Sequence, residues 1–224
     1  MNILLVAATD AEIAPFKTHL SQKWQQNNSN IFSNQKHQIE ILISGVGLVA
    51  TTFSLTKKLQ NSTYDLILQA GVAGCFDRNI SLGEVLFVTT EVFADLGAGD
   101  HYNFLDIFEI GLATPDHFPF QSKRLINPLS STHQKIELAR VSSLSVNSVS
   151  GSDFTAEARN KKYGCTLEGM EGAALHYVCL LENLPFAQIR SVSNYVEARD
   201  KTKWKIGLAI DNLGRWLIQF FDAL

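Results

Sequence analysis

Met170 and Glu171 place an apolar side chain and a carboxylate next to each other, directly before the small residues Gly172–Ala174. This order predicts a short extended segment that enters a helix, because small residues let a helix start pack closely against a strand. Further along the chain, Ile189–Asn194 has the pattern of a buried strand that ends in a serine and an amide. Parallel α/β sheets bind ligands at the carboxyl ends of their strands. The two segments therefore predict a site with an apolar platform, a carboxylate and an amide.

Three further segments follow predicted strands, and each has a functional and a structural interpretation. Glu12 comes one short turn after an apolar run, where its carboxylate can act on a ligand or complement the dipole of the next helix. The stretch Val72-Ala73-Gly74 follows a buried strand, and its glycine lets backbone N–H groups approach a ligand. The ring of Phe154 can stack on a flat heterocycle or fill the core. The amide of Asn194 can recognise a ligand or satisfy the backbone of a turn.

The composition excludes several classes of function. The chain has 224 residues, of which 46% are apolar, so it can bury a sizeable core, and its net charge of −3 argues against a nucleic-acid surface. The dinucleotide pattern GxGxxG and the phosphate-loop pattern GxxxxGK[ST] are absent, and the six histidines and three cysteines show no zinc-binding spacing. We therefore expect no metal and no cofactor.

The sequence gives no signal for export or membrane insertion. The apolar start Met1–Ala8 lacks a basic leader region and is followed at once by Asp10 and Glu12. No stretch approaches the roughly 18 uninterrupted apolar residues of a membrane span. The odd number of cysteines, all in apolar contexts, predicts reduced, buried thiols. We expect a cytoplasmic protein that binds neither nucleic acid nor membrane.

Apolar runs alternate with segments of helical periodicity along the chain. Strands are predicted at residues 2–8, 39–44, 65–70, 84–92, 144–149 and 186–193, and helices at residues 11–20, 48–59, 155–162, 172–182 and 206–224. This alternation predicts an α/β fold of three layers, α/β/α, with a mainly parallel, mixed central sheet. No repeat or linker interrupts the chain, so we expect one domain over residues 1–224.

Two segments lack this regularity. Residues 25–34 are polar and are expected to form a loop or the edge of a hairpin. Asp95–Ser131 is rich in aromatic residues and has no clear periodicity, so it is either a functional loop or an insertion.

Taken together, these segments resemble the purine nucleoside phosphorylase and nucleosidase superfamily along almost the whole chain. The resemblance rests on the strand leading to Glu12, the glycine turn Ser44–Gly47, and the segments Ala70–Gly74, Ser150–Phe154, Met170–Ala174 and Ser193–Asn194. The family pattern implies that Glu12 activates water and that Met170 and Glu171 contact the ribose. It also implies that Val72-Ala73-Gly74 lines the ribose side, that Phe154 stacks on the base, and that Ser193 and Asn194 face the base.

Within the superfamily the chain is similar to the nucleosidases, which cleave the N-ribosidic bond with water. In the branch that acts on methylthioadenosine, an aspartate corresponds to Asn194 and a serine to Val72. Ser193–Asp200 and Trp204 look more like the branch that removes hypoxanthine from futalosine, in a route to menaquinone. An amide can donate hydrogen bonds to O6 and N7 of a 6-oxopurine, whereas a carboxylate repels both unless it is protonated. We therefore expect hypoxanthine as the leaving base.

The same branch implies a pocket beyond the 5′ carbon. Futalosine carries a carboxylated phenyl group there, which an aromatic-lined cavity with one cation would suit. The aromatic residues of Asp95–Ser131 and the cation Arg199 are the candidates. These aromatics and the habit of the family also lead us to expect a homodimer or larger homo-oligomer, in which a neighbouring subunit can complete the pocket around the small nucleoside substrate.

Charge favours hydrolysis over phosphorolysis. Phosphate must be neutralised, and arginine suits it best. The first arginine is Arg78, and none lies in sequence near the first strand end, the second glycine turn or Ala70–Gly74, whereas Glu12 would repel phosphate. The alternatives are a 5′-methylthioadenosine/S-adenosylhomocysteine nucleosidase, a purine nucleoside phosphorylase, a non-catalytic nucleoside-binding protein and a flavodoxin-like binding module. The Met170–Glu171 motif argues against the last.

Overall fold

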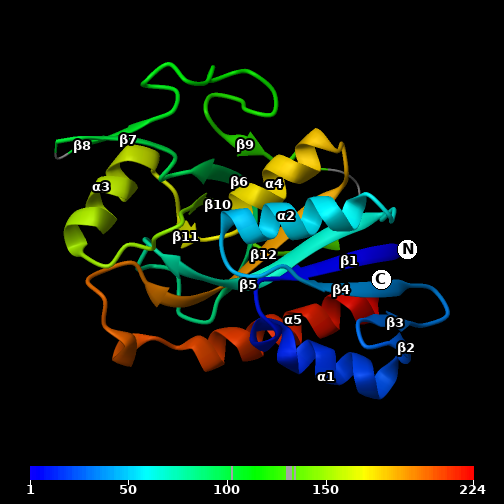
Figure 1. Ribbon diagram of the computed structural model, residues 1–224. Helices are drawn as coiled ribbons and strands as arrows, with labels where there is room; N and C mark the ends of the chain where they lie inside the picture. Colours follow the sequence, from blue (N-terminus) through cyan, green and yellow to red (C-terminus); the bar gives the residue numbers. More distant parts are fainter. Residues whose placement is uncertain (102, 130–132, 134) are drawn as a thin grey trace.

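Three strands form the centre of the molecule. They are β1 (Asn2–Ala7), β5 (Leu66–Cys75) and β12 (Phe186–Tyr195), which are buried along most of their length. Two of them, β1 and β5, are nearly continuous apolar segments. This is the composition expected of parallel strands that are covered on both faces. The computed structural model describes residues 1–101, 103–129, 133 and 135–224 (Figure 1).

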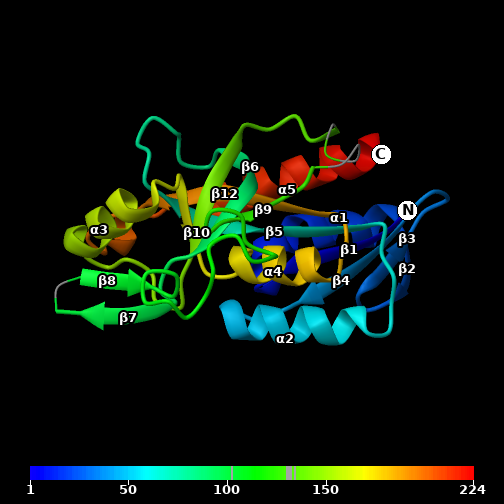
Figure 2. The ribbon, with the colours of Figure 1, turned by 90° about the horizontal axis from the view of Figure 1, so that it is seen from above.

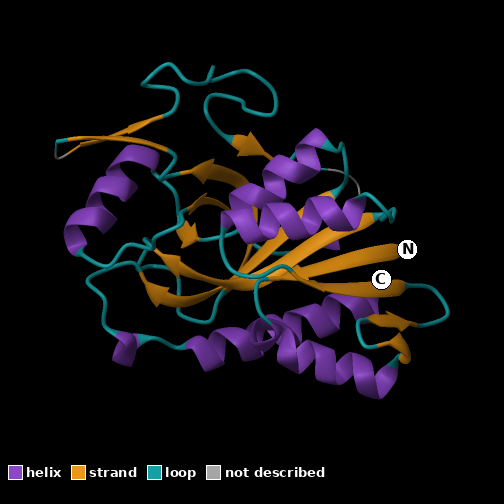
Figure 3. Cartoon of the chain, in the orientation of Figure 1, coloured by secondary structure: helices purple, strands orange, loops and turns teal. Residues whose placement is uncertain are grey.

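These strands belong to one mixed sheet, in the order β11-β10-β6-β12-β5-β1-β4-β3-β2. Its strands are orange in Figure 3. The other strands in this order are β2 (Gln25–Asn28), β3 (Ile31–Ser33), β4 (Gln38–Ile43), β6 (Val85–Phe93), β10 (Arg140–Ser145) and β11 (Leu167–Gly169). Parallel pairing joins β4, β1, β5 and β12, and also β6, β10 and β11, whereas β12 and β6 are antiparallel. The predicted mainly parallel, mixed sheet is confirmed.

One end of the sheet curls back on itself. Strand β11 pairs in parallel with β10 and antiparallel with β5, so that β5, β12, β6, β10 and β11 form a closed ring. This closure sets Glu168 of β11 opposite Gly74 of β5. Periodicity alone does not predict such a contact, because β11 is only three residues long.

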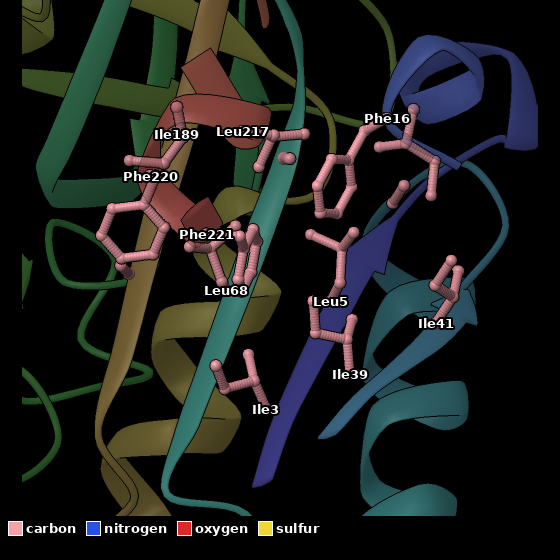
Figure 4. Close-up of a cluster of buried hydrophobic side chains, with 14 of the residues drawn as sticks. Ile3, Leu5, Phe16, Ile39, Ile41, Leu68, Ile189, Leu217, Phe220 and Phe221 are labelled. Carbon is pink, nitrogen blue, oxygen red and sulfur yellow. The ribbon is translucent and has the colours of Figure 1, made fainter. Parts of the chain in front are cut away.

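Helices cover both faces of the sheet (Figure 2). Helices α1 (Ala14–Lys23) and α5 (Ile206–Ala223) pack together on one face, and α2 (Leu48–Leu59) and α4 (Gly172–Leu181) pack together on the other. The apolar stripe of α5 enters the largest core cluster, where Leu217 and Phe221 meet Phe16 and the side chains of β1 and β5 (Figure 4). The predicted three-layer arrangement is confirmed.

Several predicted boundaries were wrong. Gly71–Gly74 lies within β5 instead of in a turn after it, because β5 keeps its pairing with β12 as far as Cys75. The strand predicted at residues 144–149 is β10, which ends at Ser145, and its polar residues Ser143 and Ser145 are buried. The helix predicted from residue 11 begins with a 3₁₀ turn, η1 (Asp10–Ile13), before α1.

The two irregular segments form peripheral structure. Residues 25–34 contain the β2–β3 hairpin at the edge of the sheet. The predicted aromatic segment contains a hairpin of β7 (Gly97–Asp100) and β8 (Asn103–Asp106), several turns, and the short strand β9 (Leu125–Ile126), which pairs with β6. Helix α3 (Asp153–Tyr163) lies beside this hairpin, and Lys162 donates to the carbonyl of Phe104. Tyr102 and residues 130 and 131 of the segment are outside the described residues.

Within the described ranges, no helix has both the length and the apolarity needed to cross a bilayer. The same residues contain no group of three histidine, cysteine or acidic side chains placed to hold a metal ion. The three cysteines are buried as free thiols.

Candidate active site

A cavity of about 430 Å³ opens at the carboxyl ends of β1, β5 and β12. Its volume lies within the range that small-molecule sites occupy. Side chains from distant parts of the sequence line it because those strand ends meet there. Among the lining residues are Glu12, Val72, Ala73, Gly74, Met170, Glu171, Ser193 and Asn194. Of the nine residues selected from the sequence, the structure brings these eight together and leaves out Phe154.

Glu12 holds its carboxylate between two backbone segments. Its Oε2 accepts a hydrogen bond from the N–H of Thr9 at 3.0 Å, and its Oε1 accepts one from the N–H of Val72 at 3.1 Å. The side chain therefore caps the turn after β1 and also reaches the cavity wall at β5. The structural and the functional interpretations of Glu12 are compatible with each other, because a carboxylate has lone pairs left after two such bonds.

Glu171 stands at the amino end of α4 and is almost completely buried, with 6% of its surface exposed. Its Oε1 accepts from the N–H of Gly47 at 3.1 Å, and its Oε2 lies 3.4 Å from Nη2 of Arg190. Buried charge is costly unless it is paired and hydrogen-bonded. Gly47 and Arg190 meet this requirement and fix the direction of the carboxylate beside Met170.

Arg190, which contacts Glu171, is the main residue of this region that the sequence analysis missed. Its side chain is 1% exposed, donates to Oε1 of Gln69 at 2.9 Å, and meets Glu171. A Cβ at position 71 would overlap the Arg190 guanidinium and come within 2.7 Å of Oε1 of Glu12, so Gly71 is required for this close approach. In the folded chain an arginine therefore does lie next to Ala70–Gly74, although Arg190 is distant from this segment in the sequence. The sequence did carry a signal for this residue, because Arg190 is the only charged residue in the buried strand β12.

A layer of buried polar groups supports the Glu171 end of α4. Glu91 of β6 accepts from Nε2 of Gln188 at 2.8 Å and from Oγ of Ser145 at 3.0 Å. Ser145 in turn accepts from the N–H of Ala173 in the first turn of α4. Burial raises the pKa of the Glu91 carboxyl, while Gln188, the charge of Arg190 and Ser145 oppose that rise. Side chains of β6, β10 and β12 thus hold the first turn of α4 in place.

Asn194 presents an amide whose orientation is set by its neighbours. Oγ of Ser193 donates to its Oδ1 at 2.8 Å, and its Nδ2 donates to the carbonyl of Tyr195 at 3.0 Å. Because the amide nitrogen carries two hydrogens, one remains for a ligand. The site therefore offers a hydrogen-bond donor at Asn194, in addition to the carboxylates of Glu12 and Glu171.

Two sets of aromatic residues that were expected at the site do not line this cavity in the described part of the chain, and their contacts with a ligand stay predictions. Phe154 is 68% exposed and lies outside the cavity lining. Ser152 accepts from the N–H of Thr155 and so starts α3 at Asp153, which turns Phe154 outward. The described residues of the segment from Asp95 onward also do not line the cavity. Phe108 and Phe120 of this segment pack instead edge-to-face with each other.

The rim of the cavity combines a cation with apolar side chains. Arg199 and Trp204 both line it, and the guanidinium carbon of Arg199 lies 5.0 Å from the centre of the Trp204 ring. Val46, Ile206 and Ile210 complete an apolar section of the wall. Arg199 is exposed, so its charge is available to a ligand that enters the cavity.

Comparison with known proteins agrees with the fold. Residues 2–222 match the family model described as the phosphorylase superfamily. The chain belongs to this superfamily, and its predicted membership is confirmed.

Particular relatives can also be named. The chain is 31% identical over 180 residues to a futalosine hydrolase of Thermus thermophilus, covering 78% of this chain and 77% of the relative. It is 29% identical over 178 residues to a futalosine hydrolase of Streptomyces coelicolor, covering 76% and 73%. The predicted likeness to the futalosine-cleaving branch is confirmed by these relatives.

Solved structures share the fold at lower identity. A 5′-methylthioadenosine/S-adenosylhomocysteine nucleosidase of Helicobacter pylori superposes with a TM-score of 0.80 at 18% identity, covering 100% of this chain and 99% of that chain. A futalosine hydrolase of the same organism gives 0.80 at 16% identity, covering 100% and 98%. The relatives are named as hydrolases or nucleosidases, in agreement with the prediction of an N-glycosyl hydrolase.

Proposed function

We propose that this protein hydrolyses the N-ribosidic bond of futalosine and releases hypoxanthine and dehypoxanthine futalosine, a step of menaquinone biosynthesis. One observation carries the proposal: Glu12, Glu171 and Asn194, which are far apart in the sequence, line one cavity. The futalosine hydrolases among the relatives support the choice of substrate.

Glu12 and Glu171 divide the work at the ribose in this proposal. Cleavage passes through a ribose with the character of a cation, and water attacks from the face opposite the leaving group. Glu12 orients the water and takes its proton while the water oxygen forms the new bond to C1′. Glu171 accepts hydrogen bonds from the 2′ and 3′ hydroxyls, and its charge favours the developing cation. Met170 and the section Val72-Ala73-Gly74 provide the apolar contacts to the sugar.

Asn194 serves the leaving base. As the C1′–N9 bond breaks, its electrons move into the hypoxanthine ring, which then takes a proton from solvent. The amide hydrogen that Tyr195 does not use can donate to N7 or O6, where this charge collects. Ser193 holds the amide oxygen, so the donor side faces the base.

The charges around the cavity favour water over phosphate. Arg190 is close to the sugar end, but it already faces Gln69 and the carboxylate of Glu171. Together with Glu12 and Glu171 it makes a group of two carboxylates and one guanidinium, which does not attract an anion. Phosphorolysis would need further cations at this end.

The 5′ side of futalosine ends in a carboxylate, for which Arg199 is the candidate partner. Arg199→Ala is expected to raise KM for futalosine by about 5- to 20-fold, since a hydrogen bond to a charged group contributes roughly 1–2 kcal/mol at a partly exposed site. The KM for inosine, which lacks the carboxylated phenyl group, should not change. Initial rates of base release on both substrates measure this. Equal KM values for futalosine in the variant and the wild type would remove Arg199 from the proposal.

Product analysis tests the function itself. The protein is incubated with futalosine, inosine and 5′-methylthioadenosine, with and without phosphate, and the released base is identified by chromatography. We expect hypoxanthine from futalosine at a rate that phosphate does not change. Preferred release of adenine would indicate the methylthioadenosine nucleosidase, and dependence on phosphate would indicate a phosphorylase.

Glu12→Gln separates an enzyme from a nucleoside-binding protein. Loss of the general base is expected to lower kcat by about 10² to 10⁴-fold, with little change in KM. Asp10→Asn is the matched control, because Asp10 lies in the same turn, pairs with Lys17 and is outside the cavity lining. Futalosine that binds to the wild type but is not cleaved, with Glu12→Gln behaving identically, would establish a binding protein.

A further inference from the structure

A second buried carboxylate lines the same cavity and has no part in the mechanism above. Glu168 of β11 has a side chain that is 4% exposed. Its Oε1 accepts from the N–H of Ser150 at 2.8 Å, and its Oε2 accepts from Oγ of Ser150 at 2.7 Å and from Nη1 of Arg159 at 2.9 Å. A carboxylate offers about four acceptor positions, and these bonds use three of them.

The closed end of the sheet places Glu168 at the base end of the cavity. Gly74 of β5 lies opposite Glu168 on one side and opposite Asn194 on the other. Residues that are directly opposite each other on neighbouring strands project to the same face of a sheet. Nδ2 of Asn194 lies 3.3 Å from the position that a Cβ of Gly74 would occupy, so that face is the one bearing the amide. Glu168 and Asn194 therefore project to one side of β5 and line one cavity.

This pair of groups matches the edge of a 6-oxopurine. Hypoxanthine presents O6 as an acceptor and N1–H as a donor, whereas adenine presents a 6-amino donor and N1 as an acceptor. The amide of Asn194 can donate to the oxygen, and a carboxylate paired with Arg159 can only accept. An adenine in the same place would set its N1 lone pair against the carboxylate.

We propose that Glu168 accepts the N1–H of the purine and, with Asn194, selects a 6-oxopurine over a 6-aminopurine. This role rests on the proposed function and assigns to Glu168 the part of base recognition that Asn194 cannot perform. Ser150 and Arg159 hold the carboxylate in place for it.

Binding of free bases to the unmodified protein tests the proposal without any variant. Calorimetry or competitive inhibition compares hypoxanthine with 1-methylhypoxanthine, which lacks the N1–H, and with adenine. We expect 1-methylhypoxanthine and adenine to bind at least 10-fold more weakly than hypoxanthine. Equal binding of hypoxanthine and adenine would overturn the role of Glu168 while leaving cleavage of futalosine, and hence the proposed function, unaffected.

Glu168→Gln then distinguishes base recognition from support of the surrounding loop. The variant is expected to lower kcat/KM for futalosine by about 10- to 100-fold, the loss of one hydrogen bond to a charged acceptor. The 6-amino counterpart of futalosine should lose much less, so the preference between the two substrates falls by at least 10-fold. A purely structural role would lower both rates equally and leave the preference unchanged, which would overturn the proposal.

Two further variants serve as controls. Ser150→Ala removes one support of the carboxylate but keeps the acceptor, so the preference between the two substrates should fall by less than in Glu168→Gln. Glu157→Gln makes the same chemical change on an exposed position of α3 and should change neither rate.

Discussion

At the scale of single residues, the side chain at position 194 decides which purine the cavity accepts in our proposal. Asn194→Asp is expected to lower kcat/KM for futalosine by about 10- to 100-fold, because a carboxylate next to O6 and N7 leaves both acceptors unsatisfied. For 5′-methylthioadenosine the value should rise, since a protonated aspartate can donate to N7 of adenine. Rates of base release from futalosine and from 5′-methylthioadenosine between pH 6 and 8 measure this change in substrate preference.

The loss with futalosine should grow as the pH rises, because only the protonated aspartate can act as a donor. Asn160→Asp on the exposed part of α3 is the matched control and should alter neither substrate. An equal change for both substrates would show that Asn194 does not read the base.

The sequence permitted prediction of residues at strand ends better than residues inside strands. Glu12, Glu171 and Asn194 were found because polar groups at the carboxyl ends of strands are exposed to a ligand. Arg190 was missed because a charged residue inside an apolar run has no visible partner until the chain is folded. Its partners Gln69 and Glu171 come from β5 and the start of α4. The exposed position of Phe154 was not foreseen, because the capping of α3 by Ser152 sets the direction of its side chain.

At the scale of elements, the first turn of α4 is held by close packing at Gly172. A Cβ at this position would overlap the carboxylate of Glu91 and the amide of Gln188. Gly172→Ala is therefore expected to lower the free energy of unfolding by about 1–3 kcal/mol, the usual cost of overpacking. It should also reduce activity, because Glu171 is the adjacent residue. Urea unfolding and the futalosine assay measure the two effects.

Gly207→Ala is the matched control for this change. Gly207 lies in the first turn of α5, and a Cβ there would have no atom within 4 Å. Alanine is the better helix former, so the control should leave stability unchanged or raise it by up to about 1 kcal/mol. A Gly172→Ala protein as stable as the control would contradict the packing argument.

Helices and long strands were predictable from the sequence, and irregular elements were not. The predicted α2 at residues 48–59 matches the structure because its apolar spacing and its glycine turn are both clear. The predicted strand at residues 144–149 lay too far along the sequence, because the serines of β10 (Arg140–Ser145) look like a loop. Ser145 is nevertheless buried, and its hydroxyl donates to Glu91. Tertiary hydrogen bonds of this kind have no signature in local periodicity.

At the scale of the whole molecule, one buried histidine links stability to pH. Complete burial lowers the pKa of His176 to about 3, from 6.5 in the unfolded chain, although bonding to the carbonyl of Leu125 opposes this. Below pH 6.5 the unfolded state takes up a proton that the folded state does not, so stability falls as the pH falls. Between pH 7 and pH 4.5 the loss from this group is about 2–3 kcal/mol.

His176→Gln should remove this part of the acid sensitivity. Urea unfolding at pH 7, 6, 5 and 4.5 is expected to show a smaller decline for the variant than for the wild type. His101→Gln changes a histidine whose side chain is 90% exposed, so its decline should match the wild type. Parallel curves for the wild type and His176→Gln would show that the imidazole is not held neutral.

The three layers of the fold were predictable from the sequence, but the closure of the sheet through β11 was not. Alternating strands and helices led to the three-layer α/β/α arrangement, whereas the second partner of β11 depends on a three-residue strand. The homo-oligomer stays a prediction, as does the division of the chain into one domain. The exposed apolar residues Val49 and Phe53 of α2 are surface that an assembly could cover.

The two ends of the sheet differ in their risk of misassembly. Strand β11 is paired on both sides, so it presents no unpaired backbone to a second chain. Strand β2 ends the order at the other side, and its residues Gln25–Asn28 are all exposed. Uncovered strand edges rich in glutamine and asparagine are templates for the addition of foreign strands. Self-association by strand addition should therefore begin at β2, no residue of which lines the cavity, and a charged or proline substitution there should suppress it without changing the activity.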